Sequence, residues 1–212
     1  MRGATNLPAR PLIESLGDKE AADAIAAISD IALDKLIDAG ALDGVPVVGA
    51  AVALVRLGKS ISSRIYAKKV LTFLREIQPM TSNERQAFSE KLYASGEAER
   101  FAEALYLFLE KADEMGKPAI LGRIVAGFVR DEFTLDDCQR LCLSVNRAFI
   151  ADLRLMKKFR DGVQIDRERA EGLFSAGLLS NGGFDGGSRD DDETGGTIFV
   201  LNRYGKLLVA LV

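Results

Sequence analysis

Apolar residues recur at helical spacing along most of the chain, between residues that are typical of helix ends. The first such run begins after Asp18, which is placed to cap a helix, and stops at Gly40, which is placed to end it. A second helix is expected to begin at Pro46 and to end before Pro79. Further helices are expected up to Ala94, up to Gly116, from Pro118 and from Thr134 to Phe159.

Two of these helix starts carry a capping box, in which a hydroxyl and an acidic side chain satisfy backbone N–H groups of the first turn. Thr81 with Glu84 and Thr134 with Asp137 have the required spacing. We therefore expect a helix to begin at each threonine, and the second to continue without a break to Phe159.

The pattern changes after residue 161. The run "DRERAEGLFSAG" predicts a short helix that ends at Gly177, and "LLSN" and "TIFVLN" predict two short strands. Residues 181–196 are rich in glycine and in acidic side chains, which predicts a flexible loop. The closing run "RYGKLLVALV" predicts a helix with Asn202 as its cap.

The fold class that follows is mainly α, a multi-helix bundle followed by a small α+β module of short helix, β-hairpin and closing helix. We expect an N-terminal arm over residues 1–17, a helical domain over 18–161 and the module over 162–212. The stretch "LFSAGLLS…IFVLNRYGKLLVAL" is similar to the end of many bacterial winged-helix domains. This resemblance implies a winged-helix-like module.

Composition removes several kinds of site. The chain has 212 residues, a net charge of −3 and no His, so Ser-His or Cys-His catalysis and His-based zinc sites cannot be built. Cys138 and Cys142 lie on one face of a helix, and we interpret them as buried small hydrophobic residues, with a redox pair as the alternative. No carboxylate pair stands in a recognisable catalytic frame. We expect no enzyme, no cofactor and no bound metal.

The stretch "ALVRLGKS", Ala53 to Ser60, fits the spacing of a phosphate-binding loop. Its four middle positions are bulky or β-branched, and such side chains resist the positive-φ conformations that a phosphate-binding loop adopts. No alternation of strands and helices surrounds the stretch. We therefore expect a continuous helix here, without affinity for nucleotides.

Small residues near the same place allow close helix packing. Gly49 and Ala53 are expected either to pack against the first helix in a soluble core or to belong to a helical hairpin, residues 18–63, that inserts into a membrane when triggered. The run "GVPVVGAAVALV" is shorter than the roughly 20 residues of a spanning helix. No secretory signal is visible, so we expect a cytoplasmic protein.

The helix pattern "PVVG…GKSI..R…KK.L.FL", together with the winged-helix-like end, resembles uncharacterised bacterial proteins of the abortive-infection alpha type, which are seen near mobile elements and phage-defence genes. The resemblance implies a role in stress or phage defence and carries over no functional residues. The chain departs from the type in its short arm and its long acidic loop.

Three functions follow as hypotheses. The first is a non-enzymatic protein that binds an unknown protein partner, a homo-oligomer being one form. The second is a DNA-binding regulator in which Arg167 and Arg169 reach the major groove, although Asp190 to Glu193 would repel phosphates. The third is a membrane-acting effector that uses residues 18–63.

Overall fold

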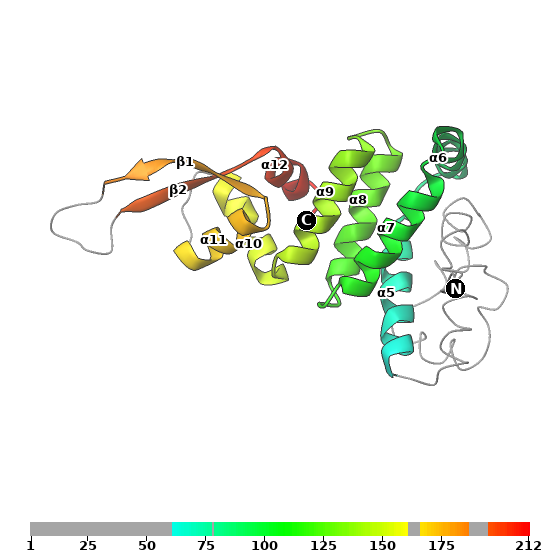
Figure 1. The fold of residues 1–212 in the computed structure, drawn as a ribbon, viewed down its shortest axis with the longest axis horizontal. Helices are drawn as coiled ribbons and strands as arrows, with labels where there is room; N and C mark the ends of the chain where they lie inside the picture. The colour runs from blue at the N-terminus through cyan, green and yellow to red at the C-terminus, as the bar shows by residue number, and fades with distance from the viewer. Residues whose placement is uncertain (1–60, 78, 161–165, 187–194) are drawn as a thin grey trace, which may run out of the picture. The chain divides into compact units, whose positions relative to one another are not determined.

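Most of the described chain is helical (Figure 1). The computed structural model describes residues 61–77, 79–160, 166–186 and 195–212. They fall into two compact units, the first ending at Phe133 and the second beginning at Thr134. The sheet in this part of the chain is a two-stranded antiparallel hairpin. The expected fold class, a mainly α chain that ends in a short helix, a hairpin and a closing helix, is confirmed.

The described part of the first unit consists of four helices: α5 (Ile61–Ile77), α6 (Ser82–Ser95), α7 (Ala98–Lys111) and α8 (Lys117–Val129). The last of these is the most apolar, with the sequence "KPAILGRIVAGFV", and most of its residues are buried. A helix that is apolar on all sides needs neighbours on all sides. Both α5 and α6 pack against it.

The backbones of α5 and α8 lie close together because Gly122 has no side chain. A Cβ atom on Gly122 would lie 2.5 Å from the carbonyl oxygen of Phe73 and 2.7 Å from Cβ of Glu76. The same pair of helices is joined by Arg123, whose Nε donates to Oε2 of Glu76 at 2.9 Å. Any larger side chain at position 122 would push the two helices apart.

Three phenylalanines hold α6, α7 and α8 together. The ring centroid of Phe88 lies 5.8 Å from that of Phe101 and 5.4 Å from that of Phe128, and the latter two are 5.8 Å apart. All three side chains are buried. Tilted and edge-to-face arrangements at such distances are the favourable ones for aromatic rings, so this cluster is the apolar centre of the unit.

Both predicted capping boxes are present. At α6, the backbone N–H of Glu84 donates to Oγ1 of Thr81 at 3.2 Å, and the N–H of Thr81 donates to Oε2 of Glu84 at 2.7 Å. Hydrogen bonds from the Thr81 side chain and backbone lower the pKa of the Glu84 carboxyl. Gly96 ends the helix in a left-handed conformation, with φ 71°.

The expected extension of α7 to Gly116 is wrong. The helix stops at Lys111, and Ala112 is extended with ψ 99°. The turn that follows places Oδ1 of Asp113 at 2.5 Å from Nζ of Lys117, a lysine whose side chain is almost fully buried. A buried ammonium needs a nearby carboxylate, and this contact supplies it.

The second unit has a helix, helix, helix, hairpin, helix order. Its elements are α9 (Leu135–Arg147), α10 (Ile150–Arg160), α11 (Arg167–Ser175), β1 (Leu179–Asp185), β2 (Gly196–Leu201) and α12 (Arg203–Val209). The uninterrupted helix expected from Thr134 to Phe159 is wrong, because Ala148 is extended, with φ −92° and ψ 155°, and separates α9 from α10.

The break at Ala148 has a geometric reason. A straight helix over residues 135–160 would be about 39 Å long at 1.5 Å per residue, which is longer than a unit of this size is wide. Bending the chain lets Val145 of α9 and Leu153 of α10 both become buried. No glycine or proline marks the position, so the local sequence gives no sign of it.

The hairpin is longer than expected. Leu179 pairs with Leu201, and the ladder continues to Asp185 opposite Gly196, so the predicted flexible loop over 181–196 is wrong for its first and last residues. A bulge at Gly182 interrupts the register between Asn181 and Gly183. Glycines with positive φ, such as Gly183 at 138° and Gly196 at 126°, allow strand pairing to continue through this irregular stretch.

The boundary expected near residue 161 falls on residues outside the described ranges. Both α9 and α10, which precede that position, belong to the second unit. Within the unit, α10 packs against β2, α11 and α12, and α9 packs against α12. These two helices therefore form part of the core on which the hairpin rests.

Candidate functional site

The helix α11 presents the two arginines that the sequence singles out. Asp166 caps the helix, and its Oδ1 accepts from the backbone N–H of Arg169 at 3.3 Å. Ala170 and Leu173 are buried and fix the orientation of the helix. Arg167 and Arg169 are both exposed, and because they are two residues apart they point to different sides of the helix.

Both arginines are engaged within their own helix. Nε of Arg167 lies 3.3 Å from Oε1 of Glu171, and Nε of Arg169 lies 3.2 Å from Oδ2 of Asp166. With Glu168 added, Asp166 to Ser175 contain three carboxylates against two arginines, which leaves a net charge of −1. A helix with this charge attracts phosphate poorly, since DNA binding draws on uncompensated positive charge.

The hairpin turns one apolar face toward the helices. Phe199 and Leu201 alternate along β2 on that face and are buried, whereas Val200, on the opposite face, is exposed. The register places Phe184 opposite Thr197, and residues directly opposite in a ladder share a face. Phe184 therefore lies on the face of Phe199, farther along the hairpin from its base.

Two phenylalanines on this face are open to solvent. Phe184 is 75% exposed and Phe174, on α11, is 47% exposed. The Phe174 ring lies 5.6 Å from that of the buried Phe199. We call Phe174, Phe184 and Phe199 the aromatic surface. Exposed aromatic side chains beside a buried one are typical of sites that bind another protein.

The base of the hairpin is fixed by Asn202. Its Oδ1 accepts from the backbone N–H of Gly205 at 2.9 Å and so caps α12, as the sequence predicts. Its Nδ2 donates to the carbonyl oxygens of Gly177 at 2.9 Å and of Leu179 at 3.1 Å. One side chain thus joins the end of α11, the start of β1 and the start of α12.

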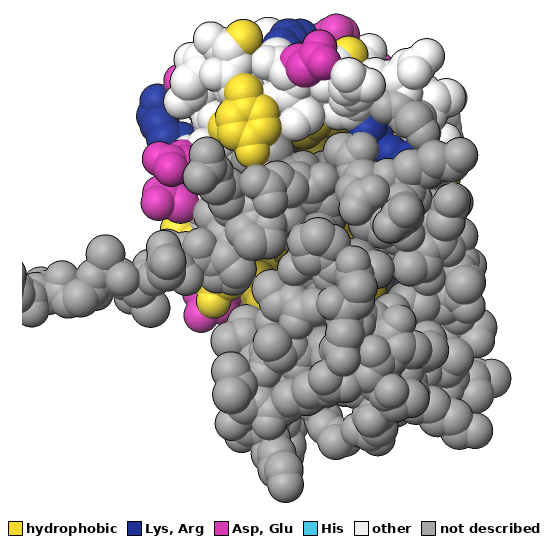
Figure 2. All heavy atoms as spheres, turned by 90° about the vertical axis from the view of Figure 1, so that its right-hand side faces the viewer, with side chains coloured by type: hydrophobic (Ala, Val, Ile, Leu, Met, Phe, Trp, Pro, Cys, Tyr) yellow, Lys and Arg dark blue, Asp and Glu magenta, His cyan; other side chains and the backbone are white. Residues whose placement is uncertain are grey.

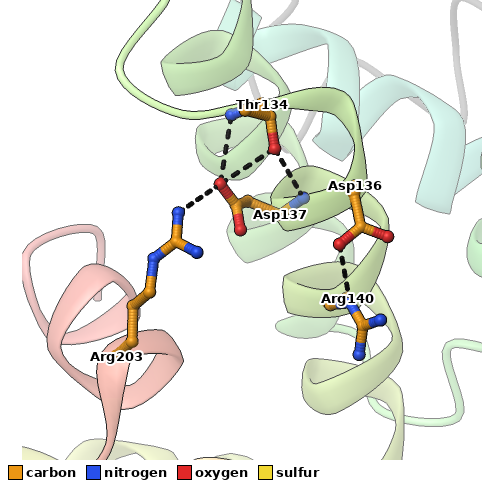
Figure 3. Close-up of polar contacts among 5 residues, drawn as sticks. All are labelled: Thr134, Asp136, Asp137, Arg140 and Arg203. Atoms are coloured by element: carbon orange, nitrogen blue, oxygen red, sulfur yellow. Dashed lines mark hydrogen bonds and ion pairs between the residues drawn. The ribbon is translucent and has the colours of Figure 1, made fainter.

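A second link holds α12 to α9 (Figure 3). Nη2 of Arg203 donates to Oδ2 of Asp137 at 2.7 Å, and the same oxygen accepts from the backbone N–H and the hydroxyl of Thr134. The guanidinium carbons of Arg140 and Arg203 lie 6.0 and 5.9 Å from the ring centroid of Tyr204. Sequence reasoning missed this link, because Asp137 and Arg203 are far apart in the chain.

The two cysteines are buried and free, as expected. A hydrogen bond with Cys138, and then burial, raise the pKa of the Cys142 thiol. The thiolate, which is the form that reacts with oxidants and metals, is therefore disfavoured. No group of three or more metal-ligating side chains occurs among the described residues.

The remaining sequence-predicted positions lie outside the described residues. They are the loop-like stretch Ala53–Ser60, the small residues Gly49 and Ala53, and the acidic run Asp190 to Glu193. In the part of the chain that is described, none of the helices combines the length and the apolar character that crossing a bilayer requires.

The described side chains that can be seen in Figure 2 carry charges of both signs. Figure 2 shows Lys and Arg next to Asp and Glu among its described side chains, with hydrophobic side chains between them. Among the described residues, we take the aromatic surface of the second unit as the candidate binding site. That assignment comes from geometry alone, since comparison with family models, with curated proteins and with solved structures found no match to this chain.

Proposed function

We propose that this chain is a non-enzymatic binding protein whose second unit contacts a partner protein through the aromatic surface. The observation that carries the proposal is the exposure of Phe174, whose ring lies 5.6 Å from that of the buried Phe199, and of Phe184 on the same face of the hairpin as Phe199. Aromatic residues that are exposed in the free protein and become buried on association supply much of the binding energy at protein interfaces. The resemblance to the abortive-infection alpha type favours a setting in stress or phage defence.

The firm base of the hairpin supports the same function. Asn202 and the Asp137–Arg203 pair fix the strands and α12 before any partner arrives. A surface that is ordered in advance loses less conformational entropy on binding. Phe184 is then presented on a supported strand rather than on a free loop.

Comparative co-purification with the full chain tests the proposal. We expect that at least one protein from cells of the source organism co-purifies with the wild type, is lost with Phe184→Ala and is retained with Phe149→Ala. Phe149 is a matched control, because it is 68% exposed and lies elsewhere in the second unit. Identical sets of proteins for the two variants would contradict the proposal.

DNA binding is the second candidate, and the element order favours it. In a helix-turn-helix protein, the second helix of the motif reads the major groove, and α11 follows α10 and directly precedes the hairpin. Fluorescence anisotropy with random and genomic duplexes decides between the two. We expect no specific binding at physiological salt. Specific binding that Arg167→Ala and Arg169→Ala weaken would favour the DNA function.

A further inference from the structure

One side of α10 carries a compact cluster of positive charge. Arg154, Lys157 and Lys158 are exposed, whereas Leu153 and Met156 are buried. Residues three and four apart lie on the same side of a helix, so the three basic side chains extend from one face of α10. Their positions span about 6 Å along the helix axis, at about 1.5 Å per residue. We call Arg154, Lys157 and Lys158 the basic face.

The basic face forms no ion pair with the described residues. Ion pairs in the described part of the second unit use other cations, which are Arg140, Arg167, Arg169 and Arg203. The acidic side chain of α10 itself, Asp152, is buried. The three exposed cations are therefore available to a ligand.

The elements that pack against α10 do not cancel this charge. They are β2, α11 and α12. The strand β2 has no charged residue, and α12 has Arg203 and Lys206 but no acid. On α11, Asp166 and Glu171 pair with the arginines of that helix, which leaves Glu168 as its unpaired acid among the described residues. The basic face thus keeps an excess of positive charge.

The size of the basic face favours a short acidic stretch over a long polyanion. A DNA-binding protein with strong salt dependence makes about 6–10 phosphate contacts, and segments that bind anionic lipids carry about four to eight Lys or Arg residues. Three cations within about one helical turn are fewer than either. A polyanion long enough to reach α11 would also meet the exposed carboxylate of Glu168.

We infer that the basic face binds a short stretch of Asp and Glu residues in the partner protein. The inference rests on the proposed function, because it takes the partner to be a protein, and it adds the chemistry of a second contact. Clusters of basic side chains recognise acidic motifs. Complementary charge steers the encounter and excludes partners of the wrong sign, whereas the aromatic surface supplies affinity.

Photo-crosslinking from the basic face identifies what binds there. We would place benzoylphenylalanine at position 157 of the full chain, which leaves Arg154 and Lys158 in place, and map the adducts formed in cells by mass spectrometry. Position 111 on α7 is the control, because Lys111 is also an exposed lysine. The expected result is a protein adduct from position 157 alone, at a stretch of the partner in which Asp and Glu predominate.

The association rate of the purified partner gives an independent readout. The Debye length falls from about 30 Å at about 0.01 M salt to about 3 Å at about 1 M salt. Over this range the rate for the wild type should fall at least about tenfold, and a variant with Arg154→Gln, Lys157→Gln and Lys158→Gln should associate slowly at every salt concentration. The matched control removes the same charge from exposed positions of α6 and α7 by Lys91→Gln, Arg100→Gln and Lys111→Gln. It should stay within about twofold of the wild type.

The outcomes separate the inference from the proposed function. The inference would be overturned by an adduct from position 157 to nucleic acid, to lipid or to a stretch of protein that is not acidic, by the absence of a protein adduct, or by equal association rates for the two triple variants. The proposed function would stand in each case if Phe184→Ala, and not Phe149→Ala, loses a partner protein. An acidic protein adduct from position 157, with identical sets of proteins for the two phenylalanine variants, would instead overturn the role of the aromatic surface and leave the basic face as the contact.

Discussion

The Asp137–Arg203 pair, in which Asp137 is buried, should contribute more to the free energy of unfolding than the neighbouring exposed pair of Asp136 and Arg140. The Asp137 side chain is 3% exposed and Arg203 is 66% exposed, whereas Asp136 and Arg140 are both exposed and form an ion pair at the same 2.7 Å (Figure 3). Distance is therefore matched between the two pairs, and burial is the variable. Water weakens the exposed pair by screening and by competing for its hydrogen bonds.

The size of the effect follows from the bonds that Asp137→Ala removes. It removes the acidic half of the α9 capping box, worth about 0.3–1.5 kcal/mol, and a hydrogen bond between charged groups, worth about 1.5–3 kcal/mol. Arg203 stays solvated when its partner is lost, so no unpaired buried cation adds to the cost. We expect the free energy of unfolding to fall by about 3 kcal/mol.

The assay is urea unfolding of the full chain followed by circular dichroism, with hydrogen exchange of α12 peptides as a local readout. Asp136→Ala, the neighbouring control, should cost at most about a third as much. A double-mutant cycle should give a coupling of about 1–2 kcal/mol between Asp137 and Arg203, and none above experimental error between Asp136 and Arg140. Equal losses for Asp137→Ala and Asp136→Ala would refute the reasoning.

Three further changes test other parts of the fold. Gly205→Ala should lower the free energy of unfolding by at least about 3 kcal/mol, because its Cβ would lie 2.2 Å from a backbone carbonyl oxygen. Gly172→Ala is the control. Its Cβ would make an ordinary contact at 3.6 Å, so this change should be neutral or stabilising by up to about 1 kcal/mol in urea titrations. Phe88→Ala should cost about 3–5 kcal/mol by the same measurement, because it empties the centre of the aromatic cluster. Cys138 and Cys142 should resist a thiol reagent in the folded protein and react in urea, since both are buried and the pKa of the Cys142 thiol is raised. Rapid reaction without denaturant would contradict this prediction.

Local signals were sufficient for most helix ends. The hydroxyl of Thr81 and the carboxylate of Glu84 stand three residues apart, and this spacing alone specifies a capping box. Gly177, with φ 82°, ends the short helix for the same local reason. At these two helix ends a few neighbouring residues determine the conformation, and sequence and structure agree.

Features that depend on distant residues could not be predicted in this way. The break at Ala148 serves the packing of the whole second unit, and no neighbouring residue signals it. The continuation of the strands through glycine-rich sequence depends on pairing across the hairpin, for example of Phe184 with Thr197. The glycines within residues 181–196 predict a loop when each strand is considered alone, without the strand that pairs with it.

The residues of the candidate site also divide into those that the sequence could locate and those that only the fold reveals. The sequence located Arg167 and Arg169 correctly on an exposed helix, but their pairing with Glu171 and Asp166 reduces what they can offer to phosphate. Phe184 and Phe174 were not singled out, since exposure of a phenylalanine becomes visible only when the fold is known. The signal that could have found Phe184 is an aromatic residue within a polar, glycine-rich run.

The most direct test of the central claim compares two crosslinking positions in the same cells. Benzoylphenylalanine at position 184 reports on the aromatic surface, and at position 169 it reports on the surroundings of one of the two arginines of α11. We predict a discrete protein adduct from position 184 and no nucleic-acid adduct from position 169. A nucleic-acid adduct from position 169, with no protein adduct from position 184, would contradict the account and assign the second unit to DNA.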